Sequence, residues 1–465
     1  MKRTAVIALI VSAALLGVLA WQAVARQRDY GRLIAEGDKA LARDETFLAV
    51  EAFSGAITLR RNAMLAYLKR GEAYRKRGES GAAFRDLRKA AELDPSATKP
   101  LELLGDLNLS LERYARAQES YEAYLRLDDR SEKVLYKLAL TRYRLGSAQT
   151  AIAPLRQAIA VDDHFAPGYY LLGLCLSALN QAAEATAALE TAVRLDPKLV
   201  AAREKLAEVY AESHRNKDAV SQFEALAELE TGRPERQVAL GLAYARTGRF
   251  DLAVATLRRV AEDHPDNTLV YVAIGRVWLD AAETQPDRIA LNKAIEALEA
   301  AARRSPPGSE TLMLLGRARL LSGDVAAAEQ TLKQATAQFP VEPAAFLQLA
   351  DAAERGGHFS TARDALARYT AISGDGIPPP ERAFHMGELS MRLNEPAKAA
   401  AWYAKAAEGP SATAAVFARL AESQFRAGDR AGALASVARG LRRDPSYPAL
   451  IAIERRIRAA APGGR

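Results

Sequence analysis

The chain has 465 residues, 49% of them hydrophobic, which is enough for a sizeable buried core. Its 64 basic and 57 acidic residues leave a net charge of +7, and the two kinds are interleaved along the sequence. Interleaved charges are typical of solvated helix faces, so no nucleic-acid partner is expected. The single cysteine, Cys175, excludes internal disulfides and cysteine-rich metal sites, and its apolar neighbours predict a buried core position.

Residues 1–29 have the pattern of a membrane anchor or a signal segment. Two cations precede an apolar run that extends from Ala5 to Trp21. Membrane spans need about 17–25 residues, whereas the apolar core of a signal peptide has about 7–15, so the length favours an uncleaved anchor. The small residues Ala23 and Ala25 also fit a cleavage site, which leaves a cleaved signal peptide and a soluble periplasmic protein as an alternative.

The charges that flank this run bear on its orientation. Lys2 and Arg3 precede it and favour a cytoplasmic N-terminus, so that the rest of the chain is exported. Because the high alanine and arginine content is typical of bacteria, the predicted location is the bacterial inner membrane, with the remaining chain in the periplasm. Arg26, Arg28 and Arg32 on the other flank keep the inverted, cytoplasm-facing orientation as an alternative.

From residue 30 onward, small residues recur with a period of 34. Eight positions with this spacing are all glycine or alanine, and the position twelve residues after each of the first seven is always alanine. A period of 34 predicts a solenoid of helix–turn–helix repeats, in which each repeat packs on its neighbours. The small positions are Gly37, Gly71, Gly105, Ala139, Gly173, Ala207, Gly241 and Gly275, and the alanines are Ala49, Ala83, Ala117, Ala151, Ala185, Ala219 and Ala253.

The second repeat shows the unit most fully. An aromatic residue, a small residue and a tyrosine follow helical spacing, and a glycine then breaks the chain. A second helical run follows and ends at a proline, which lacks the amide donor that a helix needs. These signature residues are, in order, Tyr67, Gly71, Tyr74, Gly78, Ala83, Leu87, Ala90 and Pro95.

This pattern resembles the tetratricopeptide repeat (TPR) family, and its tyrosine recurs in Tyr143, Tyr210 and Tyr244. The resemblance implies an all-α fold, a right-handed TPR solenoid of about twelve helix–turn–helix repeats that follows the N-terminal anchor or signal segment. It also implies that the first helix of each repeat lines a concave groove for protein or peptide partners. Repeats 1–10 are assigned to residues 30–374, and repeats 11–12 to residues 381–446.

The phase of the repeat slips twice. After Gly275 the expected alanine arrives seven residues late, which predicts an insertion at residues 283–289. A second slip falls in a proline-rich segment, where consecutive prolines predict an extended hinge over residues 375–380. Residues 447–465 contain no further repeat, so they are predicted to form a capping helix and a tail.

The sequence offers no arrangement typical of catalysis or metal binding. The five histidines lack metal-ligand spacing, and the repeats leave no room for a separate catalytic domain. No metal, cofactor, small-molecule substrate or enzymatic activity is therefore expected. The histidines are His164, His214, His264, His358 and His385.

The groove that the TPR resemblance implies is unusually apolar. Its exposed positions are expected three residues before, and one, four and five residues after, each small residue of a first helix. Apolar side chains there indicate a site for a peptide or a partner helix, with packing against neighbouring helices as the alternative. The candidate partner-binding residues are Tyr136, Leu140, Tyr143, Tyr170, Leu174, Val238, Leu242, Val272, Leu279, Met313, Leu320 and Leu321.

These features together predict a non-catalytic protein–protein interaction scaffold that is tethered to a membrane. By resemblance to envelope-anchored bacterial TPR proteins, it is expected to assemble an envelope complex, such as one for polysaccharide export or envelope biogenesis. The alternative is a membrane-anchored adaptor that faces the cytoplasm and recruits substrate to a separate enzyme. Membrane topology distinguishes the two.

Overall fold

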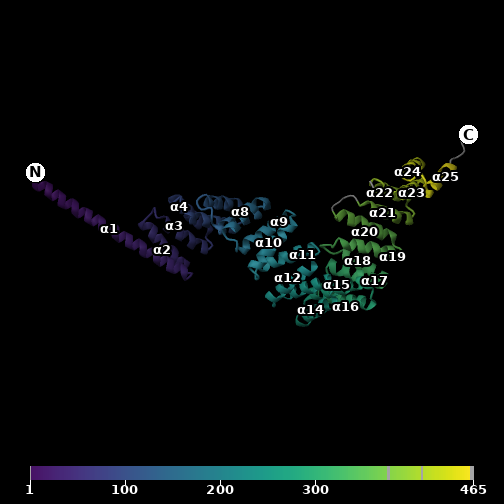
Figure 1. Ribbon diagram of the computed structural model, residues 1–465, viewed down its shortest axis with the longest axis horizontal. Coiled ribbons are helices and arrows are strands. Elements are labelled where there is room, and N and C mark those ends of the chain that lie inside the picture. The colour runs from purple at the N-terminus through teal and green to yellow at the C-terminus, as the bar shows by residue number, and fades with distance from the viewer. Residues whose placement is uncertain (1, 374–377, 410–411, 461–465) are drawn as a thin grey trace. The chain divides into compact units, whose positions relative to one another are not determined.

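The computed structural model describes residues 2–373, 378–409 and 412–460, apart from the side chains of residues 2–14 (Figure 1). Within these ranges the chain forms 25 α-helices and no strand, which confirms the predicted all-α class. The helices belong to two compact units. Unit 1 ends at Gln222 and unit 2 begins at Phe223.

The N-terminal segment is the beginning of a long helix, α1 (Lys2–Ala42), which runs without a break into the first repeat. The predicted anchor begins at Ala5, and its side chains as far as residue 14 lie outside the described residues. The large apolar side chains that follow, from Leu15 to Val24, are exposed. No helix within the described residues is long and apolar enough to span a membrane.

Unit 1 consists of α1 to α11, and α12 (Asn216–Leu229) contains the boundary with unit 2. Consecutive helices from α1 to α10 pack in pairs, each pair forming one repeat, and each pair packs on the next. The helices after α1 are α2 (Thr46–Leu59), α3 (Met64–Lys76), α4 (Ser80–Leu93), α5 (Thr98–Ser110), α6 (Tyr114–Leu125), α7 (Glu132–Arg144), α8 (Ala148–Val161), α9 (Ala166–Ala178), α10 (Ala182–Leu195) and α11 (Val200–Glu212).

Unit 2 has the same arrangement of pairs from α13 to α24. The last helix, α25 (Pro448–Ala459), packs against both α23 and α24, in the position expected of a capping helix. The helices of the pairs are α13 (Pro234–Arg246), α14 (Phe250–Asp263), α15 (Thr268–Thr284), α16 (Arg288–Arg304), α17 (Ser309–Ser322), α18 (Val325–Thr336), α19 (Ala344–Arg355), α20 (Phe359–Ile372), α21 (Pro380–Arg392), α22 (Pro396–Ala406), α23 (Ala414–Arg426) and α24 (Arg430–Arg443).

The recurring small residue is required by the contact within each pair. A β-carbon added to Gly71 would lie 2.9 Å from Leu87 Cγ, and one added to Gly173 would lie 2.6 Å from Leu189 Cγ. Both leucines hold the same position in the second helix of their repeat, and both are fully buried. A large side chain of the second helix therefore sits against a small residue of the first, which explains the period in the sequence.

The turn inside most pairs has its own recurring position, seven residues after the small residue. The backbone there has a positive φ, which glycine adopts without strain. Glycine occupies the position in several repeats, for example at Gly78 and Gly146, where φ is 77°. In repeat three the position is Glu112, with φ at 57°, so this glutamate holds a conformation that residues with a β-carbon disfavour.

The predicted insertion at residues 283–289 lengthens two helices instead of forming a loop. α15 and α16 have 17 residues each, whereas α2 has 14 and α22 has 11. Leu298 takes the place against Gly275, and it comes seven positions later than the counterpart leucine does in a regular repeat. Only residues 285–287 lie between the two helices, because the rest of the insertion continues them.

The predicted hinge is described only in part. Residues 375–377 lie outside the described residues. Pro380 is the first residue of α21, where its missing amide hydrogen costs nothing because the first amides of a helix have no partner within the helix.

Two expectations about single residues have clear outcomes. Cys175 is fully buried, as predicted, and burial raises the pKa of its thiol to about 11. The assignment of Tyr143 to the recurring tyrosine position is wrong. Tyr210 and Tyr244 stand three residues after their small residue, whereas Arg142 holds that position in repeat four and Tyr143 stands one residue later.

Candidate partner-binding site

Three of the predicted groove tyrosines gather on neighbouring first helices of unit 1. Tyr136 and Tyr143 lie two turns apart on α7, Tyr170 lies on α9, and all three are half-buried. The Tyr136 ring meets Phe165 edge-on, with ring centroids 5.4 Å apart and planes at 89°. The other two predicted residues of this unit, Leu140 and Leu174, are half-buried and pack on the same core.

Burial raises the pKa of two of these tyrosines, Tyr136 and Tyr170. It raises the pKa of Tyr136, the nearby Tyr170 raises it further, and Arg144 opposes the shift. Burial is also the main cause that raises the pKa of Tyr170, and Tyr143 adds to it. The phenol groups offer hydrogen-bond donors beside apolar rings. That combination suits the backbone carbonyls and apolar side chains of a peptide.

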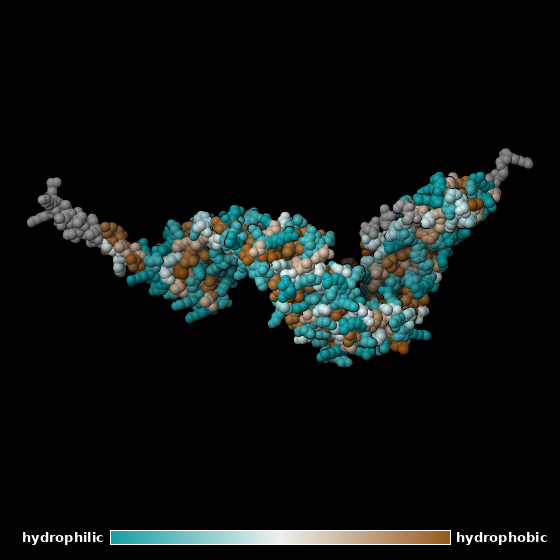
Figure 2. All heavy atoms as spheres, viewed as in Figure 1, coloured by the Kyte–Doolittle hydropathy of each residue, from teal (hydrophilic) through white to brown (hydrophobic). Residues whose placement is uncertain are grey.

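In unit 2, predicted groove residues line an apolar hollow between α13 and α15, with a volume of about 310 Å³. Val238 and Leu242 come from α13, and Val272 comes from α15. Leu269, which is 62% exposed, lines the same hollow. Hydrophobic patches lie among hydrophilic side chains on the face of both units that Figure 2 shows. An exposed apolar surface with a concave shape is typical of a protein-interaction site.

Charged side chains line the same hollow. Arg276 on α15 pairs with Glu310 on α17, and Glu235 lies on α13. A hollow with an apolar lining and flanking charges of both signs is complementary to an amphipathic segment. The apolar face of such a segment would enter the hollow, and its polar residues would lie beside the flanking charges.

Two other predicted groove residues of unit 2 belong to the core. Leu279 is 1% exposed and Leu320 is 3% exposed, so the prediction that they contact a partner is wrong. Leu279 packs among apolar residues of α16 and α17, and Leu320 packs among residues of α18 to α21, because the following repeat covers both. Met313 is half-buried against the same clusters, whereas Leu321 is 41% exposed and remains accessible.

The sequence interpretation missed a series of ion pairs between neighbouring first helices. A cation two residues before the small residue of one repeat pairs with an acid one residue after the small residue of the preceding repeat. Lys69 Nζ lies 3.0 Å from Asp38 Oδ1, and Arg419 Nε lies 3.0 Å from Glu388 Oε1. The two pairs have the same separation along the sequence, and this recurring spacing was the signal that could have identified them.

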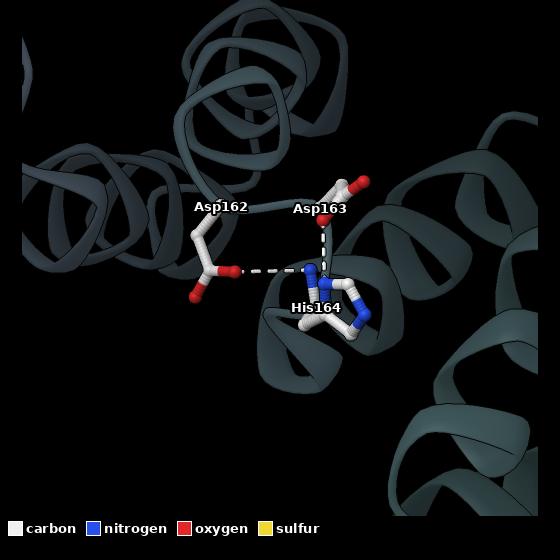
Figure 3. A group of neighbouring side chains, drawn as sticks. All are labelled: Asp162, Asp163 and His164. Atoms are coloured by element: carbon white, nitrogen blue, oxygen red, sulfur yellow. Dashed lines mark hydrogen bonds and ion pairs between the residues drawn. The ribbon is translucent and has the colours of Figure 1, made fainter.

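A group of three potential metal ligands follows α8 and consists of Asp162, Asp163 and His164 (Figure 3). Asp162 Oδ1 accepts the backbone N–H of His164 at 3.0 Å, and Asp163 Oδ1 lies 2.5 Å from His164 Nδ1. Asp94 and Asp196 accept the amide two residues later in the equivalent turns of other repeats. The turn that the repeats share therefore accounts for Asp162, and no metal site is assigned.

Comparison with protein families supports this description of the repeats. Models described as tetratricopeptide repeats match residues 65–96, 103–169, 166–199, 234–277 and 290–346. The chain belongs to the tetratricopeptide repeat family. The family prediction made from the 34-residue spacing is thus confirmed, in both units of this TPR protein.

Individual relatives resemble only parts of the TPR chain. A stretch of 122 residues is 30% identical to the small glutamine-rich tetratricopeptide repeat-containing protein 2 of Mycosarcoma maydis, covering 26% of this chain and 35% of that protein. A stretch of 87 residues is 33% identical to Hsp70-Hsp90 organizing protein 3 of Arabidopsis thaliana, covering 19% of this chain and 16% of that protein. This chain therefore spans about a third of the first relative and about a sixth of the second. A solved TPR structure from Parabacteroides merdae is 14% identical to this chain and superposes on it with a TM-score of 0.41. The aligned region covers 54% of this chain and 97% of the chain in that structure.

Proposed function

We propose that this TPR chain is a non-catalytic scaffold that holds protein partners against the first helices of its repeats. The observation that carries the proposal is the gathering of Tyr136, Tyr143 and Tyr170 on α7 and α9, where they are only half-buried. Aromatic side chains on a rigid surface bury a large area at little entropic cost, and they often dominate binding energy. The apolar hollow between α13 and α15 offers a second contact.

Removal of the tyrosines tests this function. Tyr143→Ala and Tyr170→Ala should each weaken capture of the partner that the wild-type chain retrieves by crosslinking, by about thirtyfold, because loss of an aromatic anchor costs about 2 kcal/mol. Tyr114→Ala is the matched control, since Tyr114 lies on the second helix α6 and should not affect capture. Full capture by both groove variants contradicts the proposal. Unfolding of both also contradicts it, because these rings would then be core residues.

We further propose that the N-terminal segment tethers the scaffold to the inner membrane with the repeats in the periplasm, in a complex for polysaccharide export or envelope biogenesis. The apolar run from Ala5 to Trp21 supports the tether, and Lys2 and Arg3 ahead of it support the orientation. The exposure of the described apolar residues from Leu15 to Val24 also supports it, because an apolar surface without a partner in the chain suits a lipid environment.

Fractionation and a topology reporter test the tether. Deletion of residues 1–25 should move the protein from the membrane fraction to the soluble fraction. A C-terminal alkaline phosphatase fusion should be active, because that enzyme requires export. An inactive phosphatase beside an active cytoplasmic reporter would place the repeats in the cytoplasm, as the alternative adaptor function requires.

A further inference from the structure

A hollow of about 510 Å³ lies in unit 1 where α4, α5 and α6 meet, away from the tyrosines of α7 and α9. Phe84 of α4 and Leu104 and Asn108 of α5 line it. Asn108 is only 4% exposed, and its Nδ2 donates to the Leu104 carbonyl at 2.9 Å. Its Oδ1 has no hydrogen-bond partner among the described residues. A buried acceptor without a donor is costly, so this oxygen needs an explanation.

The equivalent position in two other repeats shows an arrangement that repeat three lacks. Asn108 stands three residues after its small residue, where repeat six has Tyr210. The Tyr210 hydroxyl donates to Glu190, on the preceding second helix, at 2.6 Å, and Arg215, five residues later, lies 4.3 Å from the centre of the Tyr210 ring. Tyr244 makes the same two kinds of contact in repeat seven. In repeats six and seven a tyrosine between an acid and an arginine therefore fills this place, whereas repeats four and nine have Arg142 and Arg319 there.

Repeat three keeps only the arginine of that arrangement. Arg113 is the equivalent of Arg215, and it lies 5.6 Å from the centre of the Phe84 ring. The tyrosine is replaced by the shorter Asn108, and the acid is replaced by Arg88. The place of an aromatic ring is therefore left open, and a cation stands where the other repeats have a carboxylate.

The charge of the hollow favours an acidic ligand. Arg88, Arg113 and Arg116 line it, with Glu119 as the opposing acid. Within the described part of the chain, no carboxylate pairs with Arg88 or Arg116. Unpaired guanidinium groups bind carboxylates through charge-assisted hydrogen bonds, so these two arginines are available to acidic side chains of a ligand.

We propose that this hollow binds an acidic peptide segment of a partner, and that the segment inserts a tyrosine into it. The ring takes the place that Tyr210 fills in its own repeat, beside Arg113, while neighbouring acids pair with Arg88. The phenol supplies the donor that Asn108 Oδ1 lacks, and this bond requires a side-chain rearrangement because the oxygen is covered in the free chain. The inference rests on the proposed partner-binding function and adds a site between second helices.

A peptide probe tests the site directly. A short fluorescent peptide with one tyrosine between glutamates is titrated with the full-length chain, and binding is measured by fluorescence anisotropy. Replacement of its tyrosine by alanine, or of its glutamates by lysine, should weaken binding by about tenfold or more. Equal binding of the three peptides overturns the proposal, and so does failure of the first peptide to bind.

Variants of the chain locate the binding. The Asn108→Tyr variant fills the hollow with a tyrosine ring of the chain itself. It should abolish binding of the peptide without lowering the thermal midpoint. Arg88→Glu should weaken binding by about tenfold or more. Arg85→Glu, an equal change of charge on exposed α4 surface outside the hollow, should preserve affinity within about twofold. Unchanged binding in folded Asn108→Tyr or in Arg88→Glu overturns the assignment, and so does an equal loss in Arg85→Glu.

Partner capture is measured in parallel, so that the two proposals can fail separately. If the peptide does not bind while Tyr143→Ala and Tyr170→Ala lose the crosslinked partner, peptide binding in the hollow is refuted and the proposed groove function stands. If the peptide binds as expected while both tyrosine variants capture the partner normally, the hollow stands and the groove function is refuted.

Discussion

Two glycines at the same position of different repeats should respond differently to alanine. Gly105 and Gly173 both lie where the first helix touches the second, and a methyl group at either one overlaps a large side chain. At Gly173 that side chain is Leu189, whose Cγ would lie 2.6 Å from the new methyl, and a leucine can change its χ angles. At Gly105 it is the rigid ring of Tyr121, which is fully buried and donates to Asp106 at 2.7 Å.

Two opposing contributions decide the change in the free energy of unfolding. Alanine is favoured over glycine in a helix interior by about 1 kcal/mol. An extra methyl group in a close-packed contact costs about 1–3 kcal/mol. The two should nearly cancel for Gly173→Ala, because repeat four already has the native Ala139 in the same core as Leu155, its counterpart of Leu189. The packing cost should prevail for Gly105→Ala, which should be less stable by about 1–2 kcal/mol.

Amide hydrogen exchange measures the effect where it arises, since repeats of a solenoid open partly independently. Gly105→Ala should accelerate exchange in α5 and α6 by about tenfold, which corresponds to about 1.4 kcal/mol. Gly173→Ala should leave exchange in α9 and α10 within about twofold of the wild type. Equal protection in the two variants, or slower exchange in Gly105→Ala, would refute the reasoning that the rigidity of the neighbouring side chain decides the cost.

Three further experiments test the core and the turns. Cys175 should react slowly with a thiol reagent near neutral pH until the chain unfolds, because burial raises its pKa to about 11, and rapid labelling of the native chain would contradict this. Glu112→Gly should raise the thermal midpoint, since it relieves a left-handed conformation that costs about 1 kcal/mol, whereas a lower midpoint would argue against strain there. Ala151→Leu should cost about 1–3 kcal/mol in urea unfolding, and an unchanged midpoint would mean that Ala151 lies outside a close helix contact.

Spacing along the sequence was sufficient to predict the helix pairs, and the apolar neighbours of Cys175 were sufficient to predict its burial. A small residue of the first helix and a large one at a fixed position of the second meet because one turn joins the two helices, as Gly71 and Leu87 show. The same local geometry places the positive-φ turn seven residues after the small residue. These contacts lie within one repeat, so the sequence of that repeat determines them.

Tertiary structure decided which side chains a partner can reach. Leu279 and Leu320 occupy groove positions by their spacing, as Tyr143 does, yet the following repeat buries both leucines and leaves the tyrosine half-exposed. The space beside Asn108 is basic only because Arg88, on another helix, lines it as well. Accessibility depends on what a neighbouring helix places over a side chain, and the spacing of residues along one helix does not contain that information.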